Sequence, residues 1–169
     1  RLRRTGEARE AIDRGLDLAP AHLNLIHLKA LTFLQEGDLA GARAVLAAAP
    51  KEVEPTALVV DLAISGLSWV LDDAQRDVLL RLTPSAFGGN RADWGLALAQ
   101  AWALRGGQAK VREYAEEARR AFPAPEPEAR GGVPDASLGL ALAYLGRRGE
   151  AMREAEASVA LGPIERAPF

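Results

Sequence analysis

The 169-residue chain contains no cysteine, few aromatic residues and no strong excess of either charge. The absence of cysteine excludes disulfide bonds, thiolate metal sites and thiol catalysis. Aromatic residues make up only 5% of the chain, and runs of β-branched residues are scarce, which disfavours a β-rich fold. The formal net charge of -2 lacks the basic excess that is typical of nucleic-acid-binding proteins. We therefore expect no nucleic-acid partner.

The chain also lacks any apolar run of membrane-spanning length, and no signal-peptide pattern opens it. We therefore expect no membrane partner and a cytoplasmic location. The first residue is Arg1 rather than methionine, so we expect the sequence to be a fragment of a longer chain.

Hydrophobic residues make up 49% of the chain, mostly alanine and leucine, which are strong helix formers. Prolines and glycine-containing or Asp-rich turns divide the chain at regular places, so the sequence predicts an all-α fold. Asp38, Asp72 and Asp135 are suitable N-caps, and the proline-rich stretch 123–134 is expected to be a loop. The expected helices span 7–18, 21–36, 38–49, 55–70, 73–83, 91–105, 108–122, 135–146 and 148–161.

A pair of residues recurs four times along the chain: a small residue, then a large aromatic residue three positions later. This spacing places both on one face of a helix, one turn apart. Repetition at such a period indicates stacked helix pairs that bury their apolar faces against one another. The pairs are Ala30/Phe33, Gly66/Trp69, Ala99/Trp102 and Ala141/Tyr144.

In the 21–50 segment this pair is followed by a turn glycine, small residues in the second helix and a closing proline. The order is Ala30, Phe33, Gly37, Ala42, Ala49 and Pro50. This pattern resembles the tetratricopeptide repeat, an antiparallel helix pair that stacks into a superhelical solenoid. The resemblance implies one repeat domain over residues 1–169. Its parts are a half repeat at 5–20 and repeats at 21–50, 51–84, 89–123 and 134–163.

The last segment, 138–163, is also similar to the tetratricopeptide tails of bacterial signalling proteins such as adenylate cyclases, kinases and winged-helix regulators. In those proteins the tail serves as a sensory or docking segment beside a separate effector domain. This similarity implies a bacterial source.

In such an array the first helix of each pair lines the concave surface. We therefore predict a groove that binds a protein or peptide partner through apolar residues, with amides and a histidine fixing the register. The alternative reading, that tight curvature buries these side chains as ordinary core, stays open. The predicted groove residues are Asn24, His27, Leu28, Leu31, Gln35, Ile64, Leu67, Leu96, Gln100 and Leu104.

No enzymatic activity, cofactor or metal is predicted. His22 and His27 are five positions apart and point to different sides of a helix, and no zinc-binding HExxH pattern is present. The glycines near Phe87 lack the spacing of a phosphate-binding loop. The leading hypothesis is a non-enzymatic interaction scaffold. The alternative hypotheses are self-association and service as a regulatory segment of a larger signalling protein.

Overall fold

The computed structural model describes residues 4–122 and 136–161, which form helices connected by short turns, with no strand among them. The all-α fold predicted from the alanine- and leucine-rich sequence is therefore confirmed. The chain divides into two compact units, Arg1–Arg81 and Leu82–Phe169, and each is described by itself. The expected 123–134 loop and the expected N-cap at Asp135 lie outside the described residues.

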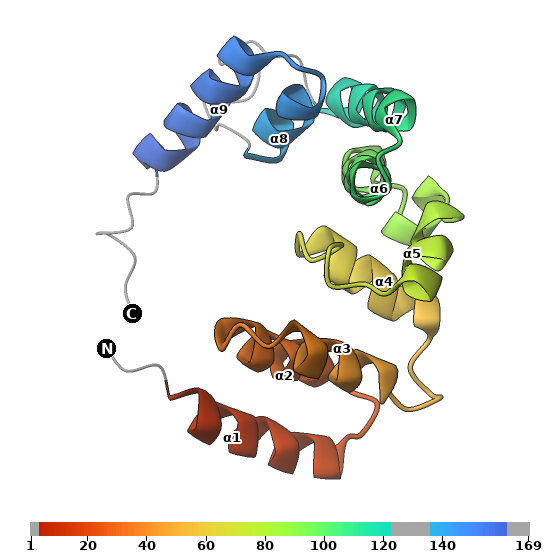
Figure 1. The fold of residues 1–169 in the computed structure, drawn as a ribbon, viewed down its shortest axis with the longest axis vertical. Helices are drawn as coiled ribbons and strands as arrows, with labels where there is room; N and C mark the ends of the chain where they lie inside the picture. Colours follow the sequence, from red (N-terminus) through yellow and green to blue (C-terminus); the bar gives the residue numbers. More distant parts are fainter. Residues whose placement is uncertain (1–3, 123–135, 162–169) are drawn as a thin grey trace. The chain divides into compact units, whose positions relative to one another are not determined.

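The described part of the first unit, residues 4–81, forms five helices, of which α2 packs against both α1 and α3, and α4 packs against α5 (Figure 1). Two of these helices begin at the predicted caps: Asp38 accepts a hydrogen bond from the amide of Gly41 before α3, and Asp72 forms a reciprocal capping box with Gln75 before α5. The helices are α1 (Thr5–Leu18), α2 (Leu23–Gln35), α3 (Leu39–Ala47), α4 (Pro55–Ile64) and α5 (Asp73–Leu80).

Helix α4 is shorter than the 55–70 expected from the sequence, because Gly66 ends it. Gly66 adopts φ 72°, a left-handed conformation that favours glycine, and the amide of Leu67 donates to the carbonyl of Leu62. Gly66 and Trp69 therefore do not share a helical face, and the prediction for this pair is wrong. Trp69 lies in the turn before α5 and is 45% exposed.

The same ending closes α2, α6 and α8, at glycines with φ between 74° and 78°. In each case the amide of the residue after the glycine donates a hydrogen bond to a carbonyl of the last helical turn. The amides of Asp38, Gly107 and Arg147 donate to the carbonyls of Phe33, Trp102 and Leu142, respectively. Phe33 and Trp102 thus occupy equivalent places, whereas Leu142 takes that place in α8. Tyr144 falls two residues later, so the fourth small–aromatic pair is not equivalent to the first.

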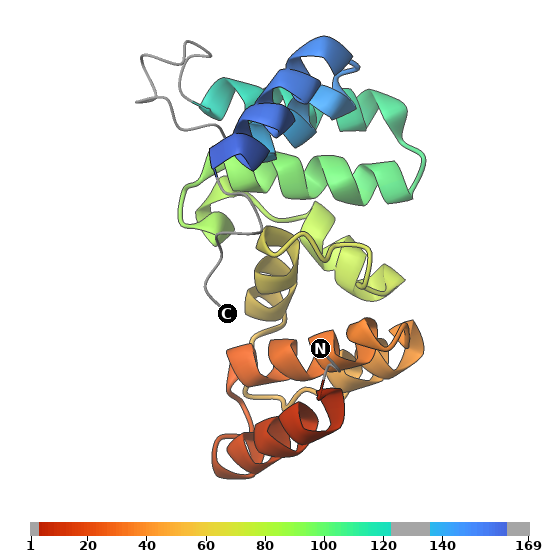
Figure 2. The ribbon, with the colours of Figure 1, turned by 90° about the vertical axis from the view of Figure 1, so that its left-hand side faces the viewer.

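In the second unit, residues 82–122 and 136–161 form a short 3₁₀ helix and four α-helices. Helices α6 and α7 run side by side, and α8 packs against both of them and against α9 (Figure 2). Asn90 caps α6 by accepting from the amides of Ala92 and Asp93. The elements are η1 (Pro84–Phe87), α6 (Arg91–Leu104), α7 (Gln108–Ala121), α8 (Ala136–Tyr144) and α9 (Arg148–Leu161).

Small residues allow α6 and α7 to approach closely. A Cβ atom built on Gly95 would lie 2.8 Å from both the amide nitrogen of Ala118 and the carbonyl oxygen of Tyr114. Beside this crossing, Leu96, Ala118 and Ala141 form a buried cluster, against which Phe122 and Tyr144 pack. Helices α6 and α7 also meet through an edge-to-face contact between the rings of Trp94 and Tyr114, whose centroids lie 5.4 Å apart.

Candidate functional site

One side of α2 is left uncovered by its neighbours in the first unit. Positions 24, 28, 31 and 35 recur every three or four residues and therefore lie on one side of a helix. Asn24 and Gln35 are exposed, Leu28 is 39% exposed and Leu31 is half-buried. We call these four residues the α2 stripe. All four belong to the groove predicted from the sequence.

The other side of α2 is held by α1 and α3. From α1, the guanidinium of Arg9 donates to Thr32 Oγ1 at 3.0 Å and to Glu36 at 2.8 Å, and it lies 3.9 Å from the centre of the Phe33 ring. From α3, Gly41 lies directly against Phe33, because a Cβ atom there would overlap the ring. These contacts orient α2 so that its stripe faces away from both helices.

The hydrogen bonds of Thr5 and Arg9 to Glu36 also lower the pKa of that carboxyl below its usual value. Glu36 is therefore an anion at neutral pH, next to Gln35 at the end of the stripe.

His27 lies at the edge of the stripe and is buried. Its Nδ1 atom is 2.6 Å from Oδ2 of Asp61, which joins α2 to α4. The Asp61 oxygen is buried. It lies within ion-pair distance of His27, but among the described residues it accepts no hydrogen bond. His27 is thus engaged inside the unit through Nδ1, and its predicted hydrogen bond to a partner stays a prediction.

The His27–Asp61 contact places α4 beside the stripe, and apolar side chains follow at its C-terminal end. Ile64, one turn after Asp61, is 54% exposed, and Leu67 is half-buried. Trp69 is 45% exposed, and the backbone around it is fixed by Arg43, which donates to the carbonyls of Val70 at 2.8 Å and Trp69 at 3.4 Å. Reasoning from the sequence missed Trp69 as a surface residue because it assigned that ring to a buried helical face.

The predicted groove residues of the second unit do not form a comparable surface. Leu96 is buried with Ala118 and Ala141, which favours the alternative reading, ordinary core, for this residue. Gln100 is half-buried, and only Leu104, at the end of α6, is exposed.

Charged residues on α7 form a face that carries both acidic and basic side chains. Glu116 accepts hydrogen bonds from Arg119 at 2.6 and 2.9 Å and from Arg120 at 3.2 Å. The hydrogen bonds from Arg119 are the main reason that the pKa of Glu116 falls to about 2. In the same unit, burial against the core cluster raises the pKa of the Tyr144 phenol. Both groups are explained by their packing.

The described residues contain no group of three or more His, Cys, Asp or Glu side chains that could hold a metal ion. His22, the other histidine, is exposed at the N-terminal cap of α2. No helix among residues 4–122 and 136–161 is long and apolar enough to cross a bilayer. Among the described residues of the first unit, exposed or half-buried apolar side chains therefore occur on the α2 stripe and at Ile64, Leu67 and Trp69.

Comparison of the chain with models of protein families, with curated proteins and with solved structures gives no match.

Proposed function

We propose that this chain is a non-enzymatic interaction module that binds an amphipathic helix of a partner protein on the α2 stripe, Ile64 and Trp69. The observation that carries the proposal is the exposure of Leu28, Ile64 and Trp69, which are three of the four large apolar side chains exposed among the described residues of the first unit. Exposed apolar side chains that gather on one surface, rather than lying scattered, are typical of protein-interaction sites.

A helix is the partner that fits this surface best. The stripe presents apolar and amide side chains at intervals of three or four residues along one side of α2, a spacing that a second helix can match with its own apolar side. Trp69 supplies a large flat ring of the kind that carries much of the binding energy in interfaces. Asn24 and Gln35, at the two ends of the stripe, would fix the register through hydrogen bonds.

This proposal extends the resemblance to tetratricopeptide repeats, whose first helices bind partners. The proposal has two further parts: the helix pairs of this chain stack as a solenoid, and residues 1–169 form one repeat domain. The similar glycine endings of α2, α4, α6 and α8 support a repeated unit. The similarity of the last segment to bacterial signalling tails would place an effector domain elsewhere on the parent protein.

The test uses an 18-residue helical peptide with leucines at positions i, i+3, i+4 and i+7 and lysine or glutamine elsewhere. Binding to the full chain is measured by fluorescence anisotropy and by shifts of backbone amides in NMR spectra. We expect saturable binding that perturbs amides of α2 and of residues 64–69. Leu28→Glu and Trp69→Glu are each expected to weaken it at least about tenfold, roughly 1.4 kcal/mol.

Met152→Glu is the matched control, because Met152 is 51% exposed on α9 of the other unit. It should leave the affinity unchanged, and a peptide with the same residues in scrambled order should not bind. Failure of the leucine peptide to saturate, or equal losses in Met152→Glu and Leu28→Glu, would contradict the proposed surface.

Self-association is a second candidate, favoured by a separate observation on α9. Met152 and Val159 are seven residues apart, so they lie on the same side of the helix, and both are more than half exposed. Such an apolar row can pair with the same row of a second copy. Light scattering over a hundredfold dilution tests this candidate: a dimer that Val159→Glu converts to a monomer supports it, and a monomer throughout contradicts it.

A further inference from the structure

The first unit contains a cleft on the side of α2 opposite the stripe. The cleft has a volume of about 530 Å³ and lies where α2 meets the C-terminal turns of α1 and α3. Its apolar walls come from Leu16, Ile26, Val45 and Pro50, and its polar groups are Asp13, Asp17 and Lys29. A volume of this size is typical of sites that enclose an organic ligand or a few residues of a peptide.

The charges of the cleft do not cancel, because two carboxylates face one ammonium. Lys29 Nζ lies 2.6 Å from Oδ1 of Asp13, and that oxygen is buried. The Asp13 side chain as a whole is nevertheless 46% exposed, so its accessible part lies away from Lys29. Lys29 therefore neutralises the charge of one carboxylate, and the residues that line the cleft keep one negative charge.

Asp17 carries the remaining charge. It is exposed and has no hydrogen bond or ion pair within residues 4–122 and 136–161. It follows Asp13 by four residues, which places the two residues on the same side of α1 with their Cβ atoms about 6 Å apart. Like charges at this spacing repel each other, so a cation bound between them would relieve the repulsion.

Two further features favour a cation with apolar neighbours at this place. The cleft is lined by the last turns of α1 and α3, and the C-terminal end of a helix carries the negative end of the helix dipole. Neither last turn contains a basic residue that would offset this negative charge. Leu18, directly after Asp17, is 89% exposed, the highest value among the large apolar residues of the described chain. A ligand held at Asp17 could therefore also cover Leu18.

We propose that this cleft binds an arginine residue within an apolar segment of a partner protein. The guanidinium would lie between the carboxylates of Asp13 and Asp17, its methylene stem against Ile26 and Val45, and a neighbouring apolar residue against Leu18. A planar guanidinium can donate to two carboxylates at once, which an ammonium on a flexible stem does less well. The apolar walls fit an organic cation better than a metal ion, which needs several oxygen ligands. The site is separate from the α2 stripe and does not depend on it.

The probe is a fluorescent 10-residue peptide of alanine and leucine with one central arginine, titrated into the full chain. We expect saturable binding, with NMR shifts concentrated in residues 13–18 and 45–50. Replacing the arginine by citrulline, which has the same shape without the charge, should weaken binding at least about tenfold. Asp17→Asn should have the same effect, because it removes the unpaired carboxylate.

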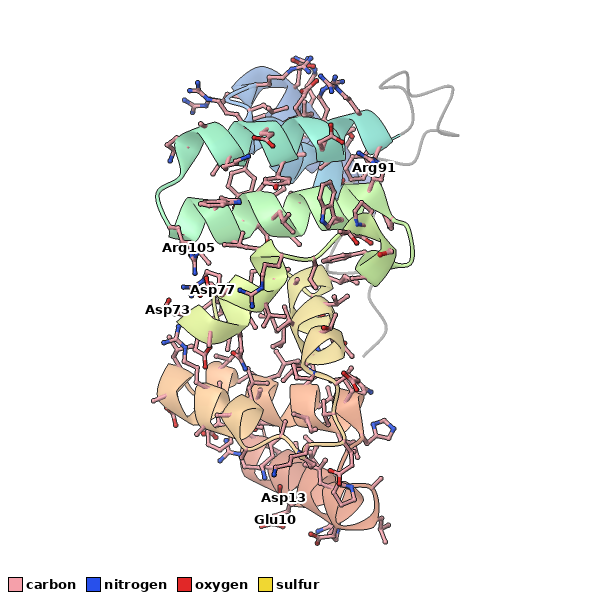
Figure 3. The ribbon with its side chains drawn as sticks, turned by 90° about the vertical axis from the view of Figure 1, so that its right-hand side faces the viewer. Glu10, Asp13, Asp73, Asp77, Arg91 and Arg105 are labelled. Atoms are coloured by element: carbon pink, nitrogen blue, oxygen red, sulfur yellow. The ribbon has the colours of Figure 1, made fainter. Side chains whose placement is uncertain are left out.

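Glu10→Gln is the matched control. Glu10 is exposed on the same helix, one turn before Asp13 (Figure 3), and does not line the cleft. It removes the same charge as Asp17→Asn, so it should change the affinity less than about twofold. Lys29→Gln should strengthen binding of the arginine peptide severalfold, because Asp13 then loses the cation that it pairs with inside the chain. The NMR amide spectrum of this variant shows whether the first unit stays folded.

Three results would overturn the proposal. The first is no saturable binding of the arginine peptide. The second is an equal loss in Glu10→Gln and Asp17→Asn, which would show attraction to the general charge of α1 rather than to the cleft. The third is equal affinity for the peptide and for free N-acetylarginine amide, which would assign the cleft to a small guanidinium compound.

Discussion

His27 on α2 and Asp61 on α4 are joined by a 2.6 Å contact between Nδ1 and Oδ2 inside the first unit. The contact connects two helices that otherwise pack against different partners, α2 with α1 and α3, and α4 with α5. It also sets the place of Ile64, one turn after Asp61, beside the uncovered stripe of α2. A single polar pair therefore positions the two parts of the proposed interaction surface.

Removing either member of this pair should destabilise the first unit. We expect His27→Ala and Asp61→Ala each to lower the free energy of unfolding by about 1–3 kcal/mol, because the partner is left buried without its contact. In urea unfolding followed by circular dichroism, the double variant should show a coupling of at least about 0.5 kcal/mol. The exposed pair Arg4–Glu7 is the control and should show a coupling near zero.

Gly95→Ala should destabilise the second unit although alanine is the better helix former. The added methyl would lie 2.8 Å from backbone atoms of α7, which can move only by separating the helices. The strain, about 1–3 kcal/mol, should exceed the helix-propensity gain of about 1 kcal/mol. Gly6→Ala on α1 is the control: nothing lies within 4 Å of its Cβ position, so it should be neutral or stabilising. A Gly95→Ala variant as stable as the natural chain would contradict the close crossing.

The pKa of Glu116, about 2 in the folded chain against an ordinary 4.5, makes a pH dependence predictable. Because the pKa of Glu116 is lower in the folded chain than in the unfolded chain, the contribution of this carboxylate to stability is fully present above about pH 4.5. It is then lost as the pH falls toward about 2. Because Glu116 is about one third exposed, the contribution should not exceed about 1 kcal/mol.

Thermal unfolding of Glu116→Gln should therefore show a lower midpoint than the natural chain at pH 7 and nearly the same midpoint at pH 2. Glu156→Gln, an exposed position on α9, is the control and should match the natural chain at both values. An equal difference at pH 7 and pH 2 would mean that the carboxylate charge contributes nothing.

The capping box at the start of α5 gives a further prediction. Asp72 Oδ1 accepts from the amide of Gln75 at 2.8 Å, and the Gln75 side chain accepts from the amide of Asp72 at 3.1 Å. Asp72→Ala should lower the free energy of unfolding by about 1 kcal/mol. Asp72→Ser should lower it much less, because a serine side chain also accepts the capping hydrogen bond. A serine variant as unstable as the alanine variant would show that charge, not capping, matters at this position.

Several parts of the candidate site were predictable from the sequence. The three- and four-residue spacing of Asn24, Leu28, Leu31 and Gln35 identifies one side of a helix, and that side is uncovered in the structure. Trp69 was not recognised, because a small–aromatic spacing indicates a shared helical face only if the helix continues. Gly66 ends α4 before that point, and a glycine within a periodic pattern does not by itself show which conformation it adopts.

The helical class and most helix boundaries could be predicted from the sequence to within a few residues, because they follow from local propensity, caps and turn glycines. Which side chains remain accessible could not be predicted in this way. His27 and Leu28 are neighbours in sequence, yet one is buried against Asp61 and the other is exposed. Burial depends on which helices pack together, and that choice is made by contacts between residues far apart in the chain. The cleft of Asp13, Asp17 and Lys29 likewise exists only where three helices meet.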